Sequence, residues 1–294
     1  MNKTRWLLIV LLLLTGVVFA QSRFRGGDRS GRGGGRFGGG RFGDSGSEEL
    51  DNPRQIPQHS NETPTWTNAP GFEKDTFTFV RIKRGYSPDG DGGPWGTDMP
   101  DSDLNLSWRL SQMTAMKVNP DGRFLHLTDR ELADYPFIYM VEPGSLRLED
   151  EEAAALRKYL LNGGFLWLDD FWGEYAWAIM ARELKKAFPD RDWVELPVSH
   201  PLYHCVFDIN AKLQVPSIHA FYGGTTSERG GDSREVHHRA IFDDKGRLMV
   251  LATHNTDNGD GWEREGEDDT YFREFSEPLA YPLAINIVFY LMTH

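Results

Sequence analysis

Between residues 136 and 188 the chain alternates short apolar runs with segments of helical periodicity, and this alternation constrains the fold more than any other sequence feature. Residues 136–141 and 165–169 are runs typical of strands buried on both faces. Between them lies a segment that opens on acidic residues, closes on basic ones and stops at Gly163, as the dipole and C-cap of a helix favour. This order predicts a mainly parallel sheet with helices on both faces.

The same alternation continues on both sides of this region. We expect these further elements: strands over residues 76–83, 123–127, 218–222, 239–242 and 247–253, and helices over 104–116, 177–188 and 281–291. The strands at 239–242 and 247–253 form a hairpin across an Asp-Asp-Lys-Gly turn. The apolar run 281–291 is too short to span a bilayer, so it predicts a core helix. The predicted class is an α/β three-layer sandwich.

Composition excludes several classes of protein. The 294 residues include 32 basic and 44 acidic side chains, and a formal net charge of −12 argues against a nucleic-acid partner. Hydrophobic residues make up 39% of the chain, which is enough for a packed core. The single cysteine, Cys205, excludes an internal disulfide, a cysteine-based zinc cluster and an iron–sulfur centre.

Residues 1–20 have the pattern of a secretory signal peptide. Lys3 and Arg5 precede an apolar run, and Val18 and Ala20 occupy the −3 and −1 positions of a cleavage site. The alternative is an uncleaved membrane anchor, but a run of about 14 apolar residues is shorter than the roughly 20 that a spanning helix needs. We therefore expect an exported, periplasmic or cell-envelope protein, which contacts the membrane only through this segment if it is retained.

Residues 21–70 are predicted to be a disordered arm, rich in glycine and arginine at first and then in proline. Residues 21–43 carry six arginines and one aspartate, a local charge of 6 − 1 = +5. Glycine removes side-chain contacts and raises chain entropy, so this stretch cannot fold alone. A flexible spacer is favoured over an arm that binds a polyanion. Residues 71–294 are then a single α/β domain.

A series of motifs in order resembles a family of bacterial exported or membrane-anchored domains of unknown function. The motifs are FTFVRIKRG, YPFIYM, LRKYLLNGGFLWLDDFWG (156–173), His200-Pro201, NTDNGDGWE and AYPLAINIVFYL. The unit at 156–173 is similar to the helix–Gly-Gly–strand unit of class I glutamine-amidotransferase-like folds, and this resemblance implies a flavodoxin-like sheet. It implies no activity. Those amidotransferases carry their cysteine in a Gly-x-Cys-x-Gly turn, whereas Cys205 lies in HPLYHC, so glutamine hydrolysis by that route is not expected.

Three polar segments follow predicted strands, at 84–103, 169–173 and 254–265. Ligands of open parallel sheets bind beyond the carboxyl ends of the strands, so we expect these segments to form one site. Their carboxylates and aromatic rings suit sugar hydroxyls or a hard cation. The expected ligand-binding residues are Trp95, Asp98, Asp101, Trp172, Asn255, Asp257, Asp260 and Trp262, and the catalytic candidates are Asp169, Asp170 and His254.

The catalytic candidates also have structural interpretations. Asp169 and Asp170 have two interpretations. Either they form a general acid/base or metal-binding pair, since two close carboxylates push their pKa values apart, or one of them caps the next helix. His254 acts as a base near neutral pH or is a hydrogen-bonded structural histidine, and the structural interpretation is favoured.

Metal-binding patterns in the sequence are weak. Residues 257–261 carry oxygen ligands but miss the EF-hand spacing, so a turn is favoured. A second set of residues matches the EF-hand spacing better, although serine replaces the first aspartate. This set is Ser87, Asp89, Asp91, Gly92 and Asp98. His200 and His204 are four residues apart, as zinc ligands on a helix are, but Pro201 favours a packed turn. We expect no obligatory cofactor and leave a divalent cation open.

Two functions follow from these observations. The favoured one is a non-catalytic ligand-binding or assembly domain of the cell envelope, with a glycan or protein partner, because no complete catalytic signature is present. The alternative is a hydrolase that acts on a carbohydrate or peptidoglycan-like substrate through Asp169 or Asp170 with His254, assisted by a divalent cation. Both require the three polar segments to meet.

Overall fold

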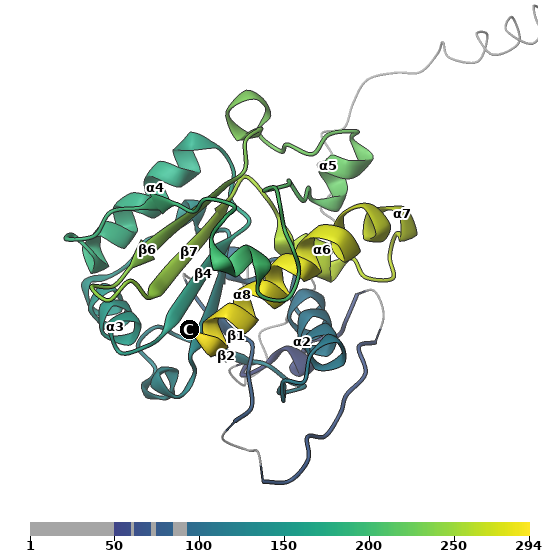
Figure 1. The fold of residues 1–294 in the computed structure, drawn as a ribbon, viewed down its shortest axis with the longest axis horizontal. Coiled ribbons are helices and arrows are strands. Elements are labelled where there is room, and N and C mark those ends of the chain that lie inside the picture. The colour runs from purple at the N-terminus through teal and green to yellow at the C-terminus, as the bar shows by residue number, and fades with distance from the viewer. Residues whose placement is uncertain (1–49, 60–61, 72–74, 85–92) are drawn as a thin grey trace, which may run out of the picture. The chain divides into compact units, whose positions relative to one another are not determined.

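A seven-stranded sheet runs through the residues that the structure, a computed structural model, describes: 50–59, 62–71, 75–84 and 93–294 (Figure 1). The predicted signal peptide and the arginine-rich part of the arm lie outside these residues. The strand order is β2-β1-β3-β4-β7-β6-β5, and the first five strands run parallel. The strands are β1 (Val80–Ile82), β2 (Arg123–Leu125), β3 (Phe137–Val141), β4 (Phe165–Asp169), β5 (Val194–Glu195), β6 (His237–Phe242) and β7 (Leu248–His254).

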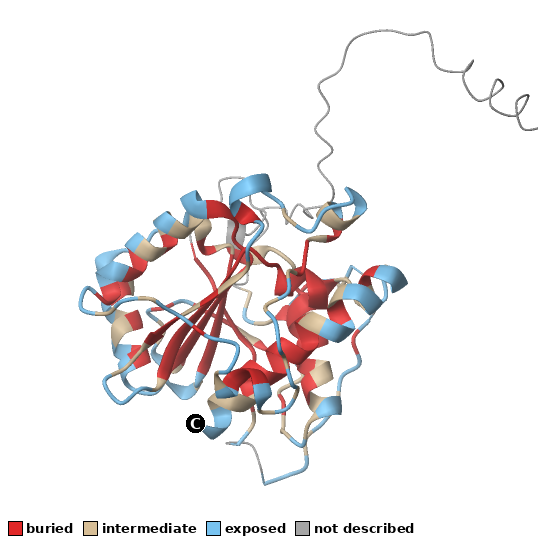
Figure 2. Ribbon diagram, turned by 45° about the horizontal axis from the view of Figure 1, so that its top comes forward, coloured by how far each residue is buried: buried red, intermediate tan, exposed pale blue. Residues whose placement is uncertain are grey.

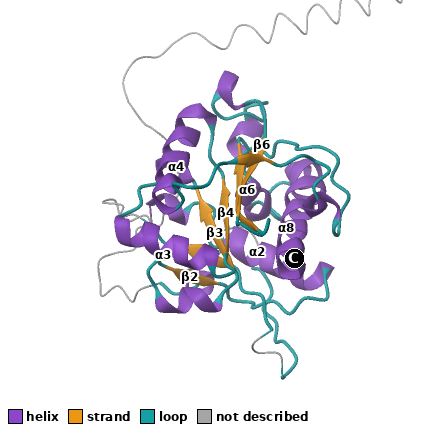
Figure 3. Cartoon of the chain, turned by 60° about the vertical axis from the view of Figure 1, so that its left-hand side comes forward, coloured by secondary structure: helices purple, strands orange, loops and turns teal. Residues whose placement is uncertain are grey.

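Helices cover both faces of the sheet, as Figure 3 shows. Helices α3 and α4 pack on one face, and α2, α6 and α8 pack on the other. The helices are α2 (Asp101–Met113), α3 (Asp150–Leu161), α4 (Gly173–Ala187), α5 (Ile218–Tyr222), α6 (Asn258–Glu263), α7 (Asp269–Tyr271) and α8 (Tyr281–Thr293), with a π-helix over Phe272–Ala280. This arrangement confirms the predicted three-layer α/β class.

Strand β3 is apolar at every position, and β4 is apolar up to its last residue, Asp169, because both faces of these central strands are buried. In β3, Phe137 and Tyr139 belong to the core under α2 and α8, whereas Ile138 and Met140 belong to the core under α3 and α4. These side chains are completely buried, and the strands are red throughout their central part in Figure 2. The side-chain period of two thus divides one apolar run between two cores.

The helix boundaries follow local signals. Helix α3 starts with a backbone N–H of Glu149 that donates to Glu152 Oε2 at 2.9 Å, and it is followed by Gly163 in the left-handed region, with φ of +109°. The antiparallel pairing of β6 with β7 confirms the predicted hairpin.

The C-terminal helix is longer than its apolar core. Helix α7, the π-helix and α8 form a continuous run from Asp269 to Thr293 that is long and apolar enough to cross a membrane by length and composition alone. More than half of its most apolar stretch is buried within the domain. Ile285, Ile287 and Val288 are at most 1% exposed, so α8 packs as the core helix that the sequence predicts.

Predictions of local structure are wrong for two segments that precede β6. Residues 218–222 form helix α5 instead of a strand, because Ser217 caps it by accepting a hydrogen bond from the Ala220 N–H at 3.3 Å. Residues 50–59 and 62–70, expected to belong to the linker, pack against the domain. Ile56 is 8% exposed, and the ring of Trp66 lies 5.4 Å from that of Trp108, so apolar anchors fix this proline-containing segment.

Candidate functional site

Four parallel strands, β1, β3, β4 and β7, end at the same edge of the sheet. The segments that come after them line a cavity of about 900 Å³. The strand order reverses beside β1, since β2 lies on one side of β1 and β3 on the other, and ligand sites of α/β sheets form at such a point. The structure therefore brings the three predicted polar segments together. The cavity is lined by these carboxylates: Asp98, Glu142, Asp170, Glu228, Asp232, Asp257, Asp260 and Glu263.

Asp170 enters the cavity from the end of β4. Its backbone is left-handed, with φ of 55°, at the point where the chain leaves the strand and turns into α4. The indole Nε1 of Trp172 donates to Asp170 Oδ1 at 2.9 Å, and the Asp170 residue is 6% exposed. The turn and the indole together fix the direction of this carboxylate.

Asp257 enters the cavity from the segment after β7. It is the N-cap of α6, and its Oδ1 accepts a hydrogen bond from the Asp260 N–H at 2.7 Å. Asp169 completes this helix start by accepting from the N–H groups of Asn258 and Gly259 at 3.1 and 3.2 Å. Two carboxylates therefore stabilise a short helix where the sequence predicts a turn over 257–261, and that prediction is wrong.

Asp98 enters the cavity from the loop between β1 and α2, and a buried arginine holds this loop. Arg81 Nη1 donates to the carbonyl oxygens of Trp95 and Thr97 at 3.0 and 2.7 Å. The Arg81 guanidinium also forms an ion pair with Asp103 in which both side chains are at most 1% exposed. An arginine in a predicted strand thus reaches across to shape the loop that carries Asp98.

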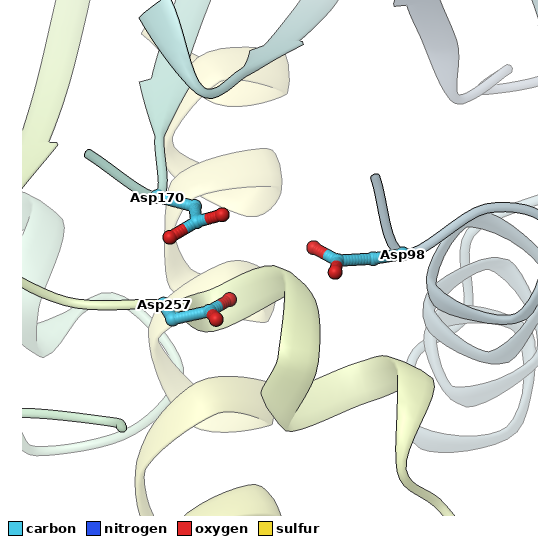
Figure 4. Close-up of side chains that lie close together, drawn as sticks. All are labelled: Asp98, Asp170 and Asp257. Carbon is cyan, nitrogen blue, oxygen red and sulfur yellow. The ribbon is translucent and has the colours of Figure 1, made fainter. Parts of the chain in front are cut away.

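The carboxylates of Asp98, Asp170 and Asp257 point toward one another (Figure 4). One oxygen from each lies within 4.8 Å of the others. Asp98 also belongs to a second group of the same size, with Asp260 and Glu263. Carboxylate oxygens at this separation are a ligand set for a hard divalent cation.

Burial and mutual repulsion perturb these carboxylates. Burial, followed by the charge of Asp260, raises the pKa of Asp98 well above its ordinary value. Burial, followed by the charge of Asp98, does the same for the pKa of Asp170. Burial, followed by the charge of Asp170, raises the pKa of Asp257, and burial raises the pKa of Glu263 to about 10. Neighbouring like charges in a buried site disfavour simultaneous ionisation, so this floor of the cavity favours protons or a cation.

Asp169 does not line the cavity. Besides the two N–H groups of α6, it accepts hydrogen bonds from the Tyr139 hydroxyl at 3.1 Å, from Asn258 Nδ2 at 2.8 Å and from the Thr253 hydroxyl. Burial still raises its pKa to about 6, although these hydrogen bonds act in the opposite direction. Of the two adjacent aspartates, Asp169 therefore joins the ends of β4, β7 and α6, and Asp170 faces the cavity.

His254 and Asn255 also have structural contacts. The His254 ring is completely buried, stacks on Phe171 with centroids 4.8 Å apart, and places Nε2 3.1 Å from the Gly173 carbonyl oxygen. Burial lowers the pKa of His254 to about 4. Asn255 Oδ1 accepts from the Gly173 N–H at 2.8 Å. Both residues thus hold the first turn of α4 against the end of β7.

Three further predicted ligand-binding residues are packed below or beside the cavity. Trp262 is completely buried, with its ring 5.3 Å from that of Trp167, and Trp95 packs edge-on against Phe124 at the same separation. Asp101 is buried, and its Oδ2 accepts from the His59 N–H at 2.9 Å. Of the predicted ligand-binding residues, those that line the cavity are Asp98, Trp172, Asp257 and Asp260.

The predicted site residues missed four carboxylates of the cavity: Glu142, Glu228, Asp232 and Glu263. Glu142 directly follows β3, with a left-handed φ of 48°, so the rule that located Asp170 could have found it. Glu263 lies at the end of α6, within the predicted polar segment 254–265, but it was not singled out because the helix itself was not predicted. Glu228 and Asp232 lie between α5 and β6, where no end of a parallel strand marks them.

Of the other two metal-binding patterns in the sequence, one lies mostly outside the described residues and the other does not form a metal site. Ser87, Asp89, Asp91 and Gly92 lie outside the described residues. His200 and His204 do not share a site: His200 Nδ1 accepts from the Leu202 N–H at 3.3 Å, and His204 pairs with Asp208.

Fold and site together define an α/β domain with an acidic cavity at the carboxyl edge of a mainly parallel sheet. The chain belongs to a family described as a domain of unknown function (DUF4159), whose model matches residues 78–292. This match confirms the predicted membership of a family of uncharacterised domains. No curated protein matches the chain.

Proposed function

We propose that the domain is a non-catalytic ligand-binding module of an exported cell-envelope protein, and that a neutral, hydroxyl-rich glycan binds in its acidic cavity. The observation that carries this proposal is the lining of the cavity, in which eight carboxylates face only two arginines, Arg229 and Arg264. A concave site of about 900 Å³ lies within the range of known ligand pockets.

The charge of the lining selects the class of ligand. With all groups ionised the lining would carry 2 − 8 = −6, and even with the five carboxylates of raised pKa protonated it would carry 2 − 3 = −1, so it disfavours anionic ligands. Carboxylates accept strong hydrogen bonds from hydroxyl groups, and a saccharide offers many hydroxyls in a small volume. A neutral glycan therefore complements this lining better than an acidic one does.

Three aromatic residues line the cavity beside the carboxylates: Phe171, Trp172 and Tyr175. Trp172 lines the cavity and is 7% exposed, and Tyr175, in the first turn of α4, lines it and is 81% exposed. Aromatic rings with one apolar face and a polar edge are suited to stack on a sugar ring. Tyr175 is the aromatic contact that a ligand would reach first.

The fate of the predicted catalytic residues supports a binding role. Asp169 accepts five hydrogen bonds, and His254 is packed between rings with Nε2 on a backbone carbonyl. Of the three catalytic candidates, Asp170 lines the cavity. A general acid and a general base must both reach the reacting atoms. Asp169 and His254 do not line the cavity, so they do not supply these groups in this arrangement.

The proposed export of the protein and its proposed resemblance to amidotransferase-like folds are supported by separate observations. The charged and apolar pattern of residues 1–20 supports a cleaved signal peptide, and the intact mass of the exported protein tests it, since cleavage leaves Gln21 first. The parallel order β2-β1-β3-β4-β7 supports the amidotransferase-like resemblance. Asp170 lies at a strand-to-helix turn, between β4 and α4, which is the kind of turn that carries the cysteine in those amidotransferases.

The binding proposal is tested with neutral and acidic envelope polysaccharides titrated into the exported full-length chain. Tyr175→Ala is expected to weaken binding of a neutral glycan by about tenfold or more, as loss of an aromatic anchor does. Tyr222→Ala is the matched control, because Tyr222 is 61% exposed but does not line the cavity. Binding only to acidic glycans, or equal binding by both variants, would refute the proposal.

A hydrolase remains a second candidate because of one observation. Asp170 and Glu142 both line the cavity and both have raised pKa values, chiefly from burial, which is typical of groups in acid–base catalysis. Turnover of a carbohydrate or peptidoglycan-like polymer that Asp170→Asn abolishes would support it. Absence of turnover with and without added calcium, magnesium or zinc would exclude it.

A further inference from the structure

Two acidic side chains, Asp170 and Asp257, and one carboxylate oxygen of Asp98 are withdrawn from water at the floor of the cavity. Asp170 and Asp257 are 6% and 3% exposed, and an oxygen of each lies within 4.8 Å of an oxygen of Asp98. Withdrawing a carboxylate from water is strongly unfavourable unless a cation or several hydrogen bonds compensate it. The floor therefore needs positive charge from some source.

The second acidic group at the same floor provides an internal comparison. Asp260 and Glu263 share Asp98 with the first group, and Arg264 forms ion pairs with both of them, with Nε 2.9 Å from Asp260 Oδ1 and Nη2 2.9 Å from Glu263 Oε2. The ion pairs formed by the described lysines and arginines include none to Asp98, Asp170 or Asp257. Arg264 thus supplies a positive charge to the group that Asp98 forms with Asp260 and Glu263. The group that Asp98 forms with Asp170 and Asp257 has no such ion pair among the described residues.

A second observation points to a ligand at this side. The Oδ2 atom of Asp98 is buried and has no hydrogen-bond partner within the described part of the chain. It lies against Gly259, where an added Cβ would be 2.1 Å away, so the glycine makes room for this oxygen. Buried carboxylate oxygens almost always have a partner. The carboxylate of Asp98 as a whole points toward those of Asp170 and Asp257 (Figure 4).

We propose that a hard divalent cation, Ca²⁺ or Mg²⁺, binds between Asp98, Asp170 and Asp257. The donor set consists of oxygen atoms without cysteine or histidine, which favours these ions over zinc or copper. The open side of the cavity leaves room for water or ligand hydroxyls to complete the coordination. The inference deepens the proposed function and rests on it, because the cation would present a coordination position to the glycan.

The test uses the metal alone. The full-length chain is stripped with a chelator and titrated with CaCl₂ and with MgCl₂ by calorimetry, and thermal unfolding is followed in parallel. We expect one binding site per chain and a rise in the unfolding temperature when the ion is added. One of the two ions is expected to bind more tightly and to raise the unfolding temperature more. Asp170→Asn and Asp257→Asn are expected to reduce affinity by about tenfold or more, since each removes a charged ligand. Asp192→Asn, at an exposed aspartate paired with Lys185 outside the cavity, is the control.

Two results would overturn the inference: no binding of either ion up to about 10 mM, beyond the range of weak extracellular calcium sites, or equal affinity in the parent and both cavity variants. A variant that unfolds is recognised by its thermal transition, and the other variant then decides. Cation binding without glycan binding would refute the proposed function alone. Glycan binding that a chelator leaves unchanged, with no metal binding, would refute the cation inference alone.

Discussion

His254 offers the sharpest test of whether a buried polar residue beside the cavity serves structure or chemistry. The folded protein holds the ring neutral, because burial lowers its pKa from 6.5 to about 4. The unfolded chain binds a proton on this side chain below pH 6.5. The unfolded state therefore gains stability relative to the folded state as the pH falls through this window.

The size of the effect is given by the two pKa values. Since one pKa unit corresponds to about 1.4 kcal/mol, the lowered pKa of His254 removes about 3 kcal/mol of stability once the pH is below about 4. At pH 5 the loss is about 2 kcal/mol relative to neutral pH, since the folded state is still almost unprotonated there.

The assay compares urea unfolding of the parent and of His254→Gln at pH 7 and pH 5. Glutamine retains a donor for the Gly173 carbonyl oxygen but does not titrate, so this variant is expected to lose about 2 kcal/mol less than the parent between the two pH values. His219→Gln, at an exposed histidine of the cavity rim, should behave like the parent. An identical pH dependence in the parent and His254→Gln would refute the structural role, as would an NMR titration of His254 near pH 6.5.

Three further predictions concern the loops that build the cavity. Gly259→Ala is expected to displace Asp98, because the new methyl group would lie 2.1 Å from Asp98 Oδ2, and calorimetry should show at least about tenfold weaker cation binding in a protein with a normal thermal transition. Asp257→Asn retains the N-cap of α6 but removes one of several repelling charges, so the cation-free variant should unfold at a higher temperature than the parent at pH 8. Arg81→Lys loses the bidentate contact with Asp103 and the hydrogen bonds to the carbonyl oxygens of the loop. Urea unfolding should show that the free energy of unfolding falls by about 2–4 kcal/mol. A decrease below about 0.5 kcal/mol would contradict the role of Arg81.

Much of the candidate site could be predicted because strand ends are visible in the sequence. Asp170 and Asp257 come after apolar runs, and neighbouring parallel strands bring the residues beyond their carboxyl ends to one edge of the sheet. The places of Glu228 and Asp232 in the cavity and the packing of residues 50–59 and 62–70 could not be predicted, since they depend on surfaces that form only when distant segments meet.

The sequence by itself determined the layers of this protein. Apolar runs without alternation require burial on both faces, and intervening segments with helical periodicity supply the two covers, so the class of the sheet can be read from patterns that are local in the chain. Only the tertiary structure decided the roles of the adjacent residues Asp169 and Asp170. Successive residues of a strand point to opposite sides, and the left-handed turn at Asp170 directs one carboxylate into the cavity while five donors from three elements enclose the other.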